Sequence, residues 1–155
     1  MSRPSIADVM LRVALALSTR STCHKLAVGA VLTDERDRIC GTGYNGVPHG
    51  MAHCTDAPCA GACAPRGSDL CEAVHAEQNA LLTCPDPFKV KTAYVTHAPC
   101  MRCTKMLLNT SCRRIVFLHA GHEPAAQDLW LRAGGEWVPH SWRNDGTETT
   151  RLLDC

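Results

Sequence analysis

Apolar side chains near the start of the chain recur every three or four residues, a spacing that predicts an amphipathic helix. The residues of this stripe are Ile6, Val9, Met10, Val13 and Leu17. Ser5 stands just before the stripe and carries the hydroxyl that a helix N-cap requires. Two apolar runs follow at 28–32 and 39–43, and the polar stretch 33–38 between them predicts a β-hairpin.

The second half of the sequence alternates between helical and strand patterns. Helices are predicted at 71–82, 101–108 and 125–133, and strands at 92–96, 114–118 and 137–138. This alternation is typical of parallel strands that are joined by crossover helices. We therefore expect one α/β domain over residues 1–155, with a polar tail that begins at about residue 144.

Residues 44–70 follow neither the helical nor the strand period and are rich in Gly, Pro, Ala and Cys. A stretch of this length without regular structure is uncommon inside a compact domain unless a local interaction orders it. The cysteines within the stretch are the residues that can provide such an interaction.

The composition is ordinary for one globular domain: 155 residues, of which 45% are hydrophobic and 20% are charged. Sixteen basic and fifteen acidic residues give a net charge of +1, which argues against a protein whose main role is to hold long nucleic acid. The sequence has no apolar segment long enough to cross a bilayer and no recognisable secretory signal. No association with a membrane is therefore expected.

Eleven cysteines and eight histidines are the unusual part of the composition. An odd number of cysteines leaves one thiol outside any complete set of disulfides. We therefore expect a reduced, cytoplasmic chain, in which cysteines and histidines bind metal in preference to forming disulfides.

Two short motifs carry the clearest chemistry, His75-Ala-Glu77 and Pro99-Cys100-Met-Arg-Cys103. The two-residue gap between Cys100 and Cys103 lets both thiolates face one zinc ion, with His75 as the third ligand. The cysteines are predicted to lie where a helix begins, so unpaired amides can donate to the thiolates. Three protein ligands leave the fourth position open for water, which is the pattern of a catalytic zinc site.

Glu77 is the predicted general acid and base. Because residues two apart point away from each other inside a helix, His75 and Glu77 can serve one site only in a helix's first turn. Two thiolates weaken the effect of zinc on the acidity of water, and a carboxylate that takes the proton compensates for this. Taken singly, the cysteine pair is also typical of a structural zinc or redox site, and His-x-Glu of a helix surface. Their combination favours catalysis.

Five segments of the chain match a known family in order over residues 5–140. They are Ser21-Thr-Cys23, Val28-Gly-Ala-Val31, Gly43-Tyr-Asn-Gly46 followed by Pro48, His75-Ala-Glu-Gln-Asn-Ala80 and Tyr94-Val-Thr-His-Ala-Pro-Cys100. On these residues the chain resembles the zinc-dependent cytidine/deoxycytidylate deaminase superfamily and, within it, the deoxycytidylate (dCMP) deaminases. The resemblance implies a three-layer α/β/α sandwich around a five-stranded mixed sheet.

The resemblance also implies an activity, the hydrolytic removal of the 4-amino group of dCMP to give dUMP for thymidylate synthesis and ammonia. Glu77 then moves protons between water, the base and the leaving amine, and the backbone at Ala98 accepts a hydrogen bond from that amine. Asn45 binds the sugar, unless Asn45-Gly46 is simply a turn dipeptide. Lys25 meets the 5′-phosphate as a point charge, unless it is a solvated surface lysine.

A second, structural zinc is expected from relatives that carry one on cysteines like Cys23 and Cys54. Our predicted ligand set is Cys23, Cys54, Cys59 and Cys71, and Cys63, His49 or His53 can replace one member. The alternative is that these are free buried thiols, because cysteine is a common small core residue. Three other cysteines, Cys40, Cys84 and Cys112, are expected to pack in the core.

Family relatives commonly form homohexamers and respond to dCTP and dTTP, so a homo-oligomer, these effectors and an accompanying Mg²⁺ are implied by the resemblance. The competing functions are a tRNA adenosine deaminase, a free cytidine deaminase and a non-catalytic, zinc-stabilised regulatory module. The segment Gly43-Tyr-Asn-Gly46 and the near-zero net charge favour a mononucleotide substrate. Glu77 argues against the non-catalytic module, because a structural zinc site needs no carboxylate beside it.

Overall fold

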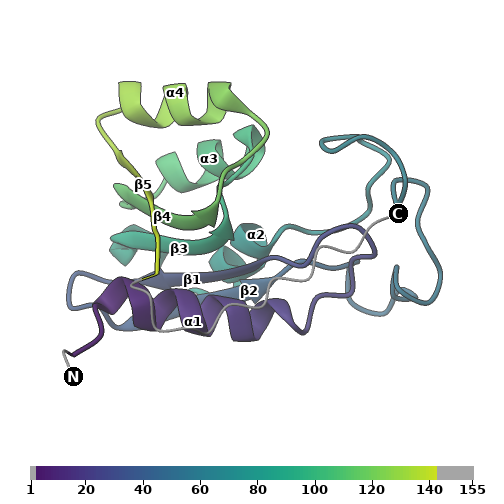
Figure 1. Cartoon of the computed structure of the whole chain (residues 1–155), viewed down its shortest axis with the longest axis horizontal. Helices are drawn as coiled ribbons and strands as arrows, with labels where there is room; N and C mark the ends of the chain where they lie inside the picture. Colours follow the sequence, from purple (N-terminus) through teal and green to yellow (C-terminus); the bar gives the residue numbers. More distant parts are fainter. Residues whose placement is uncertain (1–2, 143–155) are drawn as a thin grey trace.

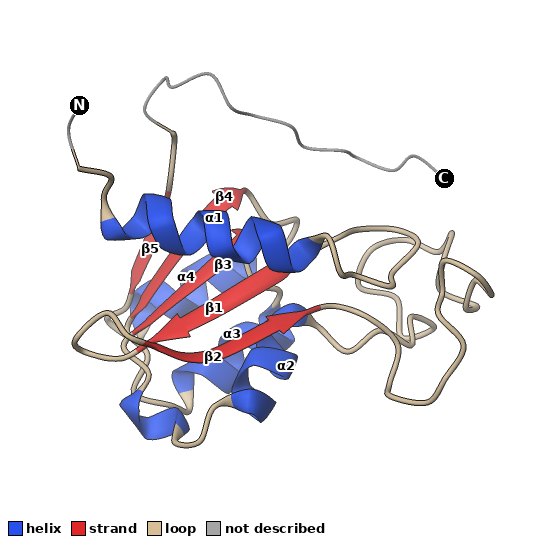
Figure 2. Cartoon of the chain, turned by 90° about the horizontal axis from the view of Figure 1, so that it is seen from below, coloured by secondary structure: helices blue, strands red, loops and turns tan. Residues whose placement is uncertain are grey.

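Five strands form one mixed sheet in the order β2-β1-β3-β4-β5, and helices cover both of its faces (Figures 1 and 2). The computed structural model describes residues 3–142. The strands are β1 (Gly29–Thr33), β2 (Ile39–Tyr44), β3 (Thr92–His97), β4 (Arg114–His119) and β5 (Glu136–Pro139). The helices are α1 (Ile6–Ser18), α2 (Ala76–Thr83), α3 (Met101–Leu108) and α4 (Pro124–Arg132), with a short 3₁₀ helix, η1 (Pro87–Lys89).

The strand directions follow from the lengths of the connections. β1 and β2 form the predicted antiparallel hairpin, and β1 also pairs antiparallel with β3. β3, β4 and β5 run parallel, with α3 and α4 as the crossovers between them. α1 lies on one face of the sheet and α2, α3 and α4 lie on the other (Figure 2). The predicted three-layer arrangement is therefore confirmed.

The first helix begins as predicted, and Met10, Val13 and Leu17 of the predicted stripe pack in the core, but the buried face is shifted toward Leu11 and Ala14. The Ser5 hydroxyl accepts from the Asp8 amide at 3.1 Å, and the Asp8 carboxylate accepts from the Ser5 amide at 2.9 Å, which forms a capping box. Val9, on the predicted apolar stripe, is 39% exposed, whereas Ala14 is fully buried. The cause is close packing, because a Cβ on Gly29 would overlap the Ala14 carbonyl oxygen.

The prediction of a helix from residue 71 was wrong at its start, because α2 begins at Ala76. The preceding segment is extended, and Val74 exchanges backbone hydrogen bonds with Gly46 at 2.8 and 3.1 Å. This contact over a long sequence separation takes the amides that a helix would need. The other predicted helices and strands lie within one or two residues of their observed bounds, and η1 was not predicted.

The main core lies between the sheet and the three helices on one face. Its members include Cys84, Cys112 and Trp130, with Cys40 and Trp137 packed against it, so the predicted packing role of the three cysteines is confirmed. The predicted polar tail and Cys155 lie outside the described residues. Between residues 3 and 142, the helices are too short or too polar to cross a membrane.

Residues 45–75 form the irregular connection that extends beyond one end of the sheet, at the right of Figure 1. Turns and bends make up most of it, as the lack of periodicity predicted. We call this segment the cysteine-rich loop. Because it lies at the end of the sheet where β3 leads into α3, it can contribute to a site at that edge.

Candidate active site

The three predicted metal ligands meet at the starts of two helices. His75 is the N-cap of α2, Cys100 is the N-cap of α3, and Cys103 lies in the first turn of α3. Their ligand atoms all lie within 4.8 Å of one another. The Nδ1 atom of His75 is 3.5 Å from the Cys100 sulfur and 3.4 Å from the Cys103 sulfur. The start of α2 at Ala76 puts His75 and Glu77 in the first turn, where both can face one point.

These distances fit a tetrahedral zinc ion. Zinc bonds of about 2.05 Å to nitrogen and about 2.3 Å to sulfur place the two ligand atoms about 3.6 Å apart. Both nitrogen-to-sulfur distances in this site are close to that value. The donor set of one imidazole and two thiolates is one that zinc prefers. His75, Cys100 and Cys103 can therefore hold zinc and leave its fourth position open.

The two ligand thiols shift each other's pKa in opposite directions. The pKa of Cys100 falls to about 3, mainly because the Cys103 thiol donates a hydrogen bond to its sulfur. The pKa of Cys103 rises for the same reason, and its burial adds to the effect. The Cys100 thiolate also raises the pKa of His75 through a hydrogen bond. The site thus gathers negative charge that a divalent cation would neutralise.

Glu77 lies beside the ligands and is only 4% exposed. Burial raises the pKa of its carboxyl, which also hydrogen-bonds with the Cys103 side chain. A carboxyl with a raised pKa can both accept and release a proton near neutral pH, as a general acid and base must. The structure therefore brings the predicted acid/base and the three predicted ligands into one place.

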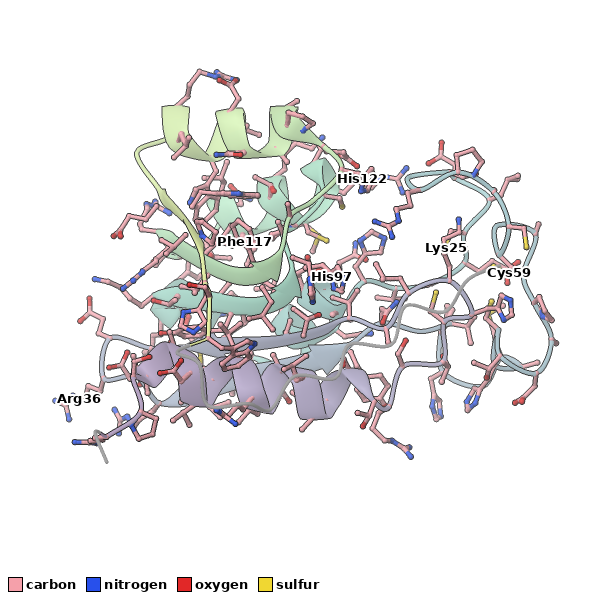
Figure 3. All side chains as sticks on the ribbon, in the orientation of Figure 1. Lys25, Arg36, Cys59, His97, Phe117 and His122 are labelled. Carbon is pink, nitrogen blue, oxygen red and sulfur yellow. The ribbon has the colours of Figure 1, made fainter. Side chains whose placement is uncertain are left out.

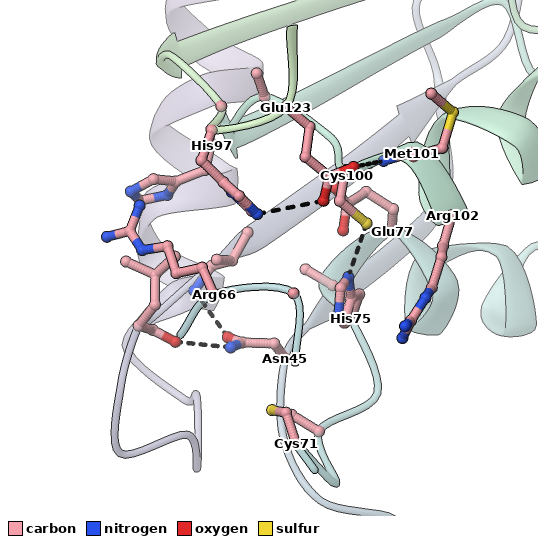
Figure 4. A pocket seen from close by; sticks show the side chains of 18 of the residues that line it. Asn45, Arg66, Cys71, His75, Glu77, His97, Cys100, Met101, Arg102 and Glu123 are labelled. Carbon is pink, nitrogen blue, oxygen red and sulfur yellow. Dashed lines mark hydrogen bonds and ion pairs between the residues drawn. The ribbon is translucent and has the colours of Figure 1, made fainter. Parts of the chain in front are cut away.

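A cavity of about 490 Å³ opens beside this group (Figure 4). His75, Glu77 and Cys100 form part of its wall, and Arg66 and Cys71 of the cysteine-rich loop also line it. Four cationic side chains also line it, namely Lys25, Arg66, Arg102 and Lys105. The volume is within the range of about 300–1,000 Å³ that is usual for small-molecule sites.

Asn45 lines this cavity and is also held by the backbone around it (Figure 4). Its Oδ1 accepts from the Val28 amide at 2.8 Å and from the Ser21 hydroxyl at 2.7 Å. Its Nδ2 donates to the Leu26 carbonyl at 2.7 Å. Asn45 therefore orders residues 21–28 at the cavity wall, whichever of its two predicted roles it has.

Lys25 and Ala98 also line the cavity, as their predicted contacts with substrate require. The Lys25 ammonium donates to the carbonyl of Ala64 in the cysteine-rich loop, so it is neither freely solvated nor aimed only at the cavity. The Ala98 amide donates to the His119 carbonyl at 2.9 Å, which fixes the backbone just before Cys100.

Arg66 is a cavity residue that no motif or spacing in the sequence indicates. It lies in the cysteine-rich loop, beside His97 on β3 (Figure 4). Burial, the neighbouring His119 and the charge of Arg66 lower the pKa of His97 to about 4, so this imidazole is neutral near pH 7. Arg102 pairs with Asp69, whereas no carboxylate among residues 3–142 pairs with Arg66.

The predicted second set of ligands is gathered only in part. The sulfur atoms of Cys54 and Cys59 are 3.8 Å apart. Cys71 is close enough to Cys23 and Cys59 for their charges to raise its pKa, although burial is the larger cause. In the described part of the chain, a third ligand atom does not join the Cys54–Cys59 pair within 4.8 Å. Cys63 is exposed.

Comparisons with known proteins agree with the site. Residues 4–119 match the family described as the cytidine and deoxycytidylate deaminase zinc-binding region. The chain is 40% identical over 125 residues to a deoxycytidylate deaminase of Mycobacterium phage D29, which covers 76% of this chain and 97% of the relative. It is 38% identical over 125 residues to ComE operon protein 2 of Bacillus subtilis, covering 76% of this chain and 62% of that one.

Some relatives are longer than this chain. The chain spans 38% of a deoxycytidylate deaminase of Saccharomyces cerevisiae, to which it is 32% identical over 124 residues, or 74% of this chain. Among solved structures, the dCMP deaminase of cyanophage S-TIM5 in complex with dCMP and dUMP is similar, with a TM-score of 0.72 and 25% identity. That match covers 90% of this chain and 100% of the cyanophage chain.

Proposed function

Because the chain belongs to the cytidine and deoxycytidylate deaminase zinc-binding family, we propose that it hydrolyses dCMP to dUMP and ammonia. The observation that carries this proposal is the convergence of His75, Cys100 and Cys103 with the buried carboxyl of Glu77 at one wall of a nucleotide-sized cavity. The phage relative, whose length this chain nearly spans, is named for the same activity.

His75, Cys100 and Cys103 would hold the zinc ion, which when bound lowers the pKa of coordinated water to near neutrality. Glu77 accepts the proton of the water that attacks C4 of the cytosine. It then gives that proton to N3. In a second transfer the same carboxyl takes the proton of the hydroxyl now bonded to C4 and passes it to the amine, which leaves as the C4–N bond breaks and the C4 carbonyl forms. One water is consumed and one ammonia is released. Burial of Glu77 favours these transfers because it weakens the carboxyl as an acid.

The rest of the cavity is assigned to the remainder of the nucleotide. The backbone carbonyl of Ala98, beside Cys100, accepts from the 4-amino group. Asn45 meets the sugar at the wall that it orders. The 5′-phosphate needs a cation. Two arginines line the cavity; Arg102 pairs with Asp69, whereas Arg66 pairs with no carboxylate among residues 3–142. Lys25 adds a second positive charge near the cysteine-rich loop.

A substrate panel tests the proposal. Zinc-loaded protein is incubated with dCMP, CMP, deoxycytidine and an adenosine-containing tRNA stem-loop, and released ammonia is measured. We expect dCMP to be preferred and the Glu77→Gln variant to release almost none. Preference for the stem-loop or for deoxycytidine would favour the corresponding rival function. Absence of ammonia from every substrate would favour a regulatory module.

A second zinc in the cysteine-rich loop is part of the proposal. Two sulfurs on one tetrahedral zinc lie about 3.8 Å apart, which is the separation of the Cys54 and Cys59 sulfurs. Cys23 and Cys71 lie nearby and complete the proposed set. Metal analysis of native protein should give two zinc ions per chain, whereas one zinc per chain would return these cysteines to the free-thiol interpretation.

The family relationship also suggests how the protein assembles and how it is regulated. We propose a cytoplasmic homohexamer that dCTP activates and dTTP inhibits, with Mg²⁺ accompanying the nucleotide. Large apolar side chains at the surface, such as Leu82 at 79% exposure and Phe88 at 70%, are candidates for subunit contacts. Analytical ultracentrifugation and initial rates with each effector test these points. A monomer whose rate ignores both nucleotides would contradict them.

A further inference from the structure

The turn between β4 and α4 lies directly against the segment that carries the metal ligands. The Oε2 atom of Glu123, at the end of this turn, accepts a hydrogen bond from the Met101 amide at 2.8 Å (Figure 4). Met101 is the first residue of α3 and stands between Cys100 and Cys103. Glu123 therefore contacts the backbone that joins the two thiolate ligands.

The Met101 amide needs an acceptor because the first amides of a helix have no partner within the helix. The Glu123 carboxylate supplies that acceptor for the Met101 amide. Glu123 occupies the N-cap position of α4 but makes no capping bond to its own helix. Its carboxylate instead accepts a hydrogen bond at the start of α3.

The Glu123 side chain is itself held in place. Its Oε1 atom is 3.2 Å from Nε2 of His122. A Cβ on Gly67 of the cysteine-rich loop would lie 3.6 Å from this His122 nitrogen and 3.8 Å from Glu123 Oε1, so the loop packs against the pair. Gly121 packs against Ala98 in the same way, with its Cβ position 3.1 Å from the Ala98 carbonyl oxygen.

We propose that Glu123 is a positioning residue for the catalytic zinc: by holding the Met101 amide, it fixes where Cys100 and Cys103 present their sulfur atoms. This inference rests on the proposed zinc site and deepens it. Glu123 acts through the backbone and touches neither the ligand atoms nor the reacting carbon. Hydrogen bonds that orient metal ligands typically change metal affinity by about 10–100-fold when they are removed.

Two substitutions with side chains as long as glutamate distinguish loss of the hydrogen-bond acceptor from loss of side-chain bulk. Glu123→Gln keeps an oxygen that can accept from the Met101 amide, whereas Glu123→Met has none. Asp128→Ala is the matched control, because Asp128 is an acidic residue on the same α4 helix whose exposed carboxylate pairs with Arg132. Far-UV circular dichroism establishes that each variant folds.

Metal affinity is measured by competition with a chelator, and the ligand field by the absorption bands of the Co²⁺-substituted protein. We expect Glu123→Met to bind zinc about 10–100-fold more weakly with shifted Co²⁺ bands, and Glu123→Gln and Asp128→Ala to resemble the unmodified protein. Neither measurement uses dCMP, so a failure of the proposed activity would leave this test intact.

Two results would overturn the proposal. One is wild-type zinc affinity and wild-type Co²⁺ bands in a folded Glu123→Met protein. The other is a loss of affinity beyond about tenfold in Glu123→Gln, which retains the acceptor. The second result is decisive even where Glu123→Met does not fold. Normal affinity in Glu123→Gln together with weakened affinity in Glu123→Met is the outcome that a general packing role would not produce, because both side chains keep the bulk of glutamate.

Discussion

Two regions of this molecule gather cysteines, and they do so by different means. At the start of α3, Cys100 and Cys103 are fixed by the helix, and their sulfurs lie within 4.8 Å of the His75 nitrogen. In the cysteine-rich loop, Cys54 and Cys59 come within 3.8 Å, but among residues 3–142 no third ligand atom completes the group. Regular secondary structure thus brings three ligand atoms together in one region, whereas turns bring only two sulfur atoms together in the other.

The two regions are held by different contacts, and this explains the difference between them. The start of α3 is held by parallel pairing of β3 with β4 and by the Glu123 carboxylate on the Met101 amide. The loop is held at separate points, including the Gly46–Val74 bridge and the Lys25 hydrogen bond to Ala64. Between such points its turns leave few buried apolar residues, with Cys54 and Ala62 as examples of those present. Metal binding would supply the missing local stability.

The largest effect is expected from a substitution in the group of His75, Cys100 and Cys103. Cys103→Ala removes a ligand that is completely buried, so it should lower bound zinc by one equivalent per chain and reduce dCMP turnover to background. Metal analysis and the ammonia assay measure the two effects. Cys112→Ala is the control, since Cys112 is equally buried but packs in the core away from the ligands. Full zinc content in Cys103→Ala would contradict the assignment.

Replacement of Glu77 should separate chemistry from metal binding at the same site. Glu77→Gln has nearly the same shape but cannot carry a proton, so we expect turnover to fall roughly 10²–10⁴-fold with zinc content unchanged. Single-turnover measurements on the zinc-loaded variant check this. Near-normal turnover would remove Glu77 from its acid and base role.

The loop is tested by Cys54→Ser. Loss of this buried thiol should remove the second zinc, leave the catalytic zinc in place and expose residues 44–70 to limited proteolysis. Exposed Cys63, also in the loop, provides the control variant Cys63→Ser. Two zinc ions per chain in Cys54→Ser would show that the loop does not depend on Cys54 for metal.

A smaller effect is expected where the loop meets the cavity. Arg66→Ala should raise KM for dCMP about tenfold while leaving activity on deoxycytidine unchanged, because only dCMP carries the phosphate. Arg36→Ala is the control, since Figure 3 shows Arg36 at the left end of the molecule, well away from His97 near its middle. Equal losses on both substrates would indicate a structural role for Arg66.

The smallest effect lies outside both cysteine regions, at the start of α1. The hydrogen bond from the Ser5 hydroxyl is the main cause that lowers the pKa of Asp8 from 3.8 to about 2. Since the folded state favours the carboxylate, its contribution to stability is present above about pH 4 and is lost as the pH falls towards 2. The urea midpoints of the wild type and Asp8→Asn should therefore differ at pH 6 and converge near pH 2. A difference that stays constant with pH would contradict this.

How much the sequence could predict depends on how local each feature is. The ligands His75, Cys100 and Cys103 are identifiable because their motifs lie at helix starts, where a few neighbouring residues set the geometry. The start of α2 was misplaced because the Gly46–Val74 bridge, between residues far apart in the sequence, holds the preceding segment extended. Periodicity carries no information about such a contact.

Arg66 and Glu123 were missed for a related reason. Arg66 lies in a loop without periodicity, so nothing in its neighbours indicates that it reaches the cavity. Glu123 contacts Met101 across 22 positions of sequence and from a different crossover connection. The buried face of α1 depends on the absence of a side chain at Gly29, a constraint imposed by the strand and not by the helix.

The contact between Asp8 and His140 has a consequence for how the chain is connected. These side chains meet at 2.9 Å although 132 positions separate them, and they join the first helix to the residue after β5. The two ends of the described fold therefore lie close together, on the face of the sheet that α1 covers. A short linker could join those ends, and new termini could open in the exposed hairpin turn at 34–37. In such a circular permutant, the stretch from His75 to Glu123 would remain unbroken, because both the new termini and the linker lie outside it, so we expect the three ligands to meet as before.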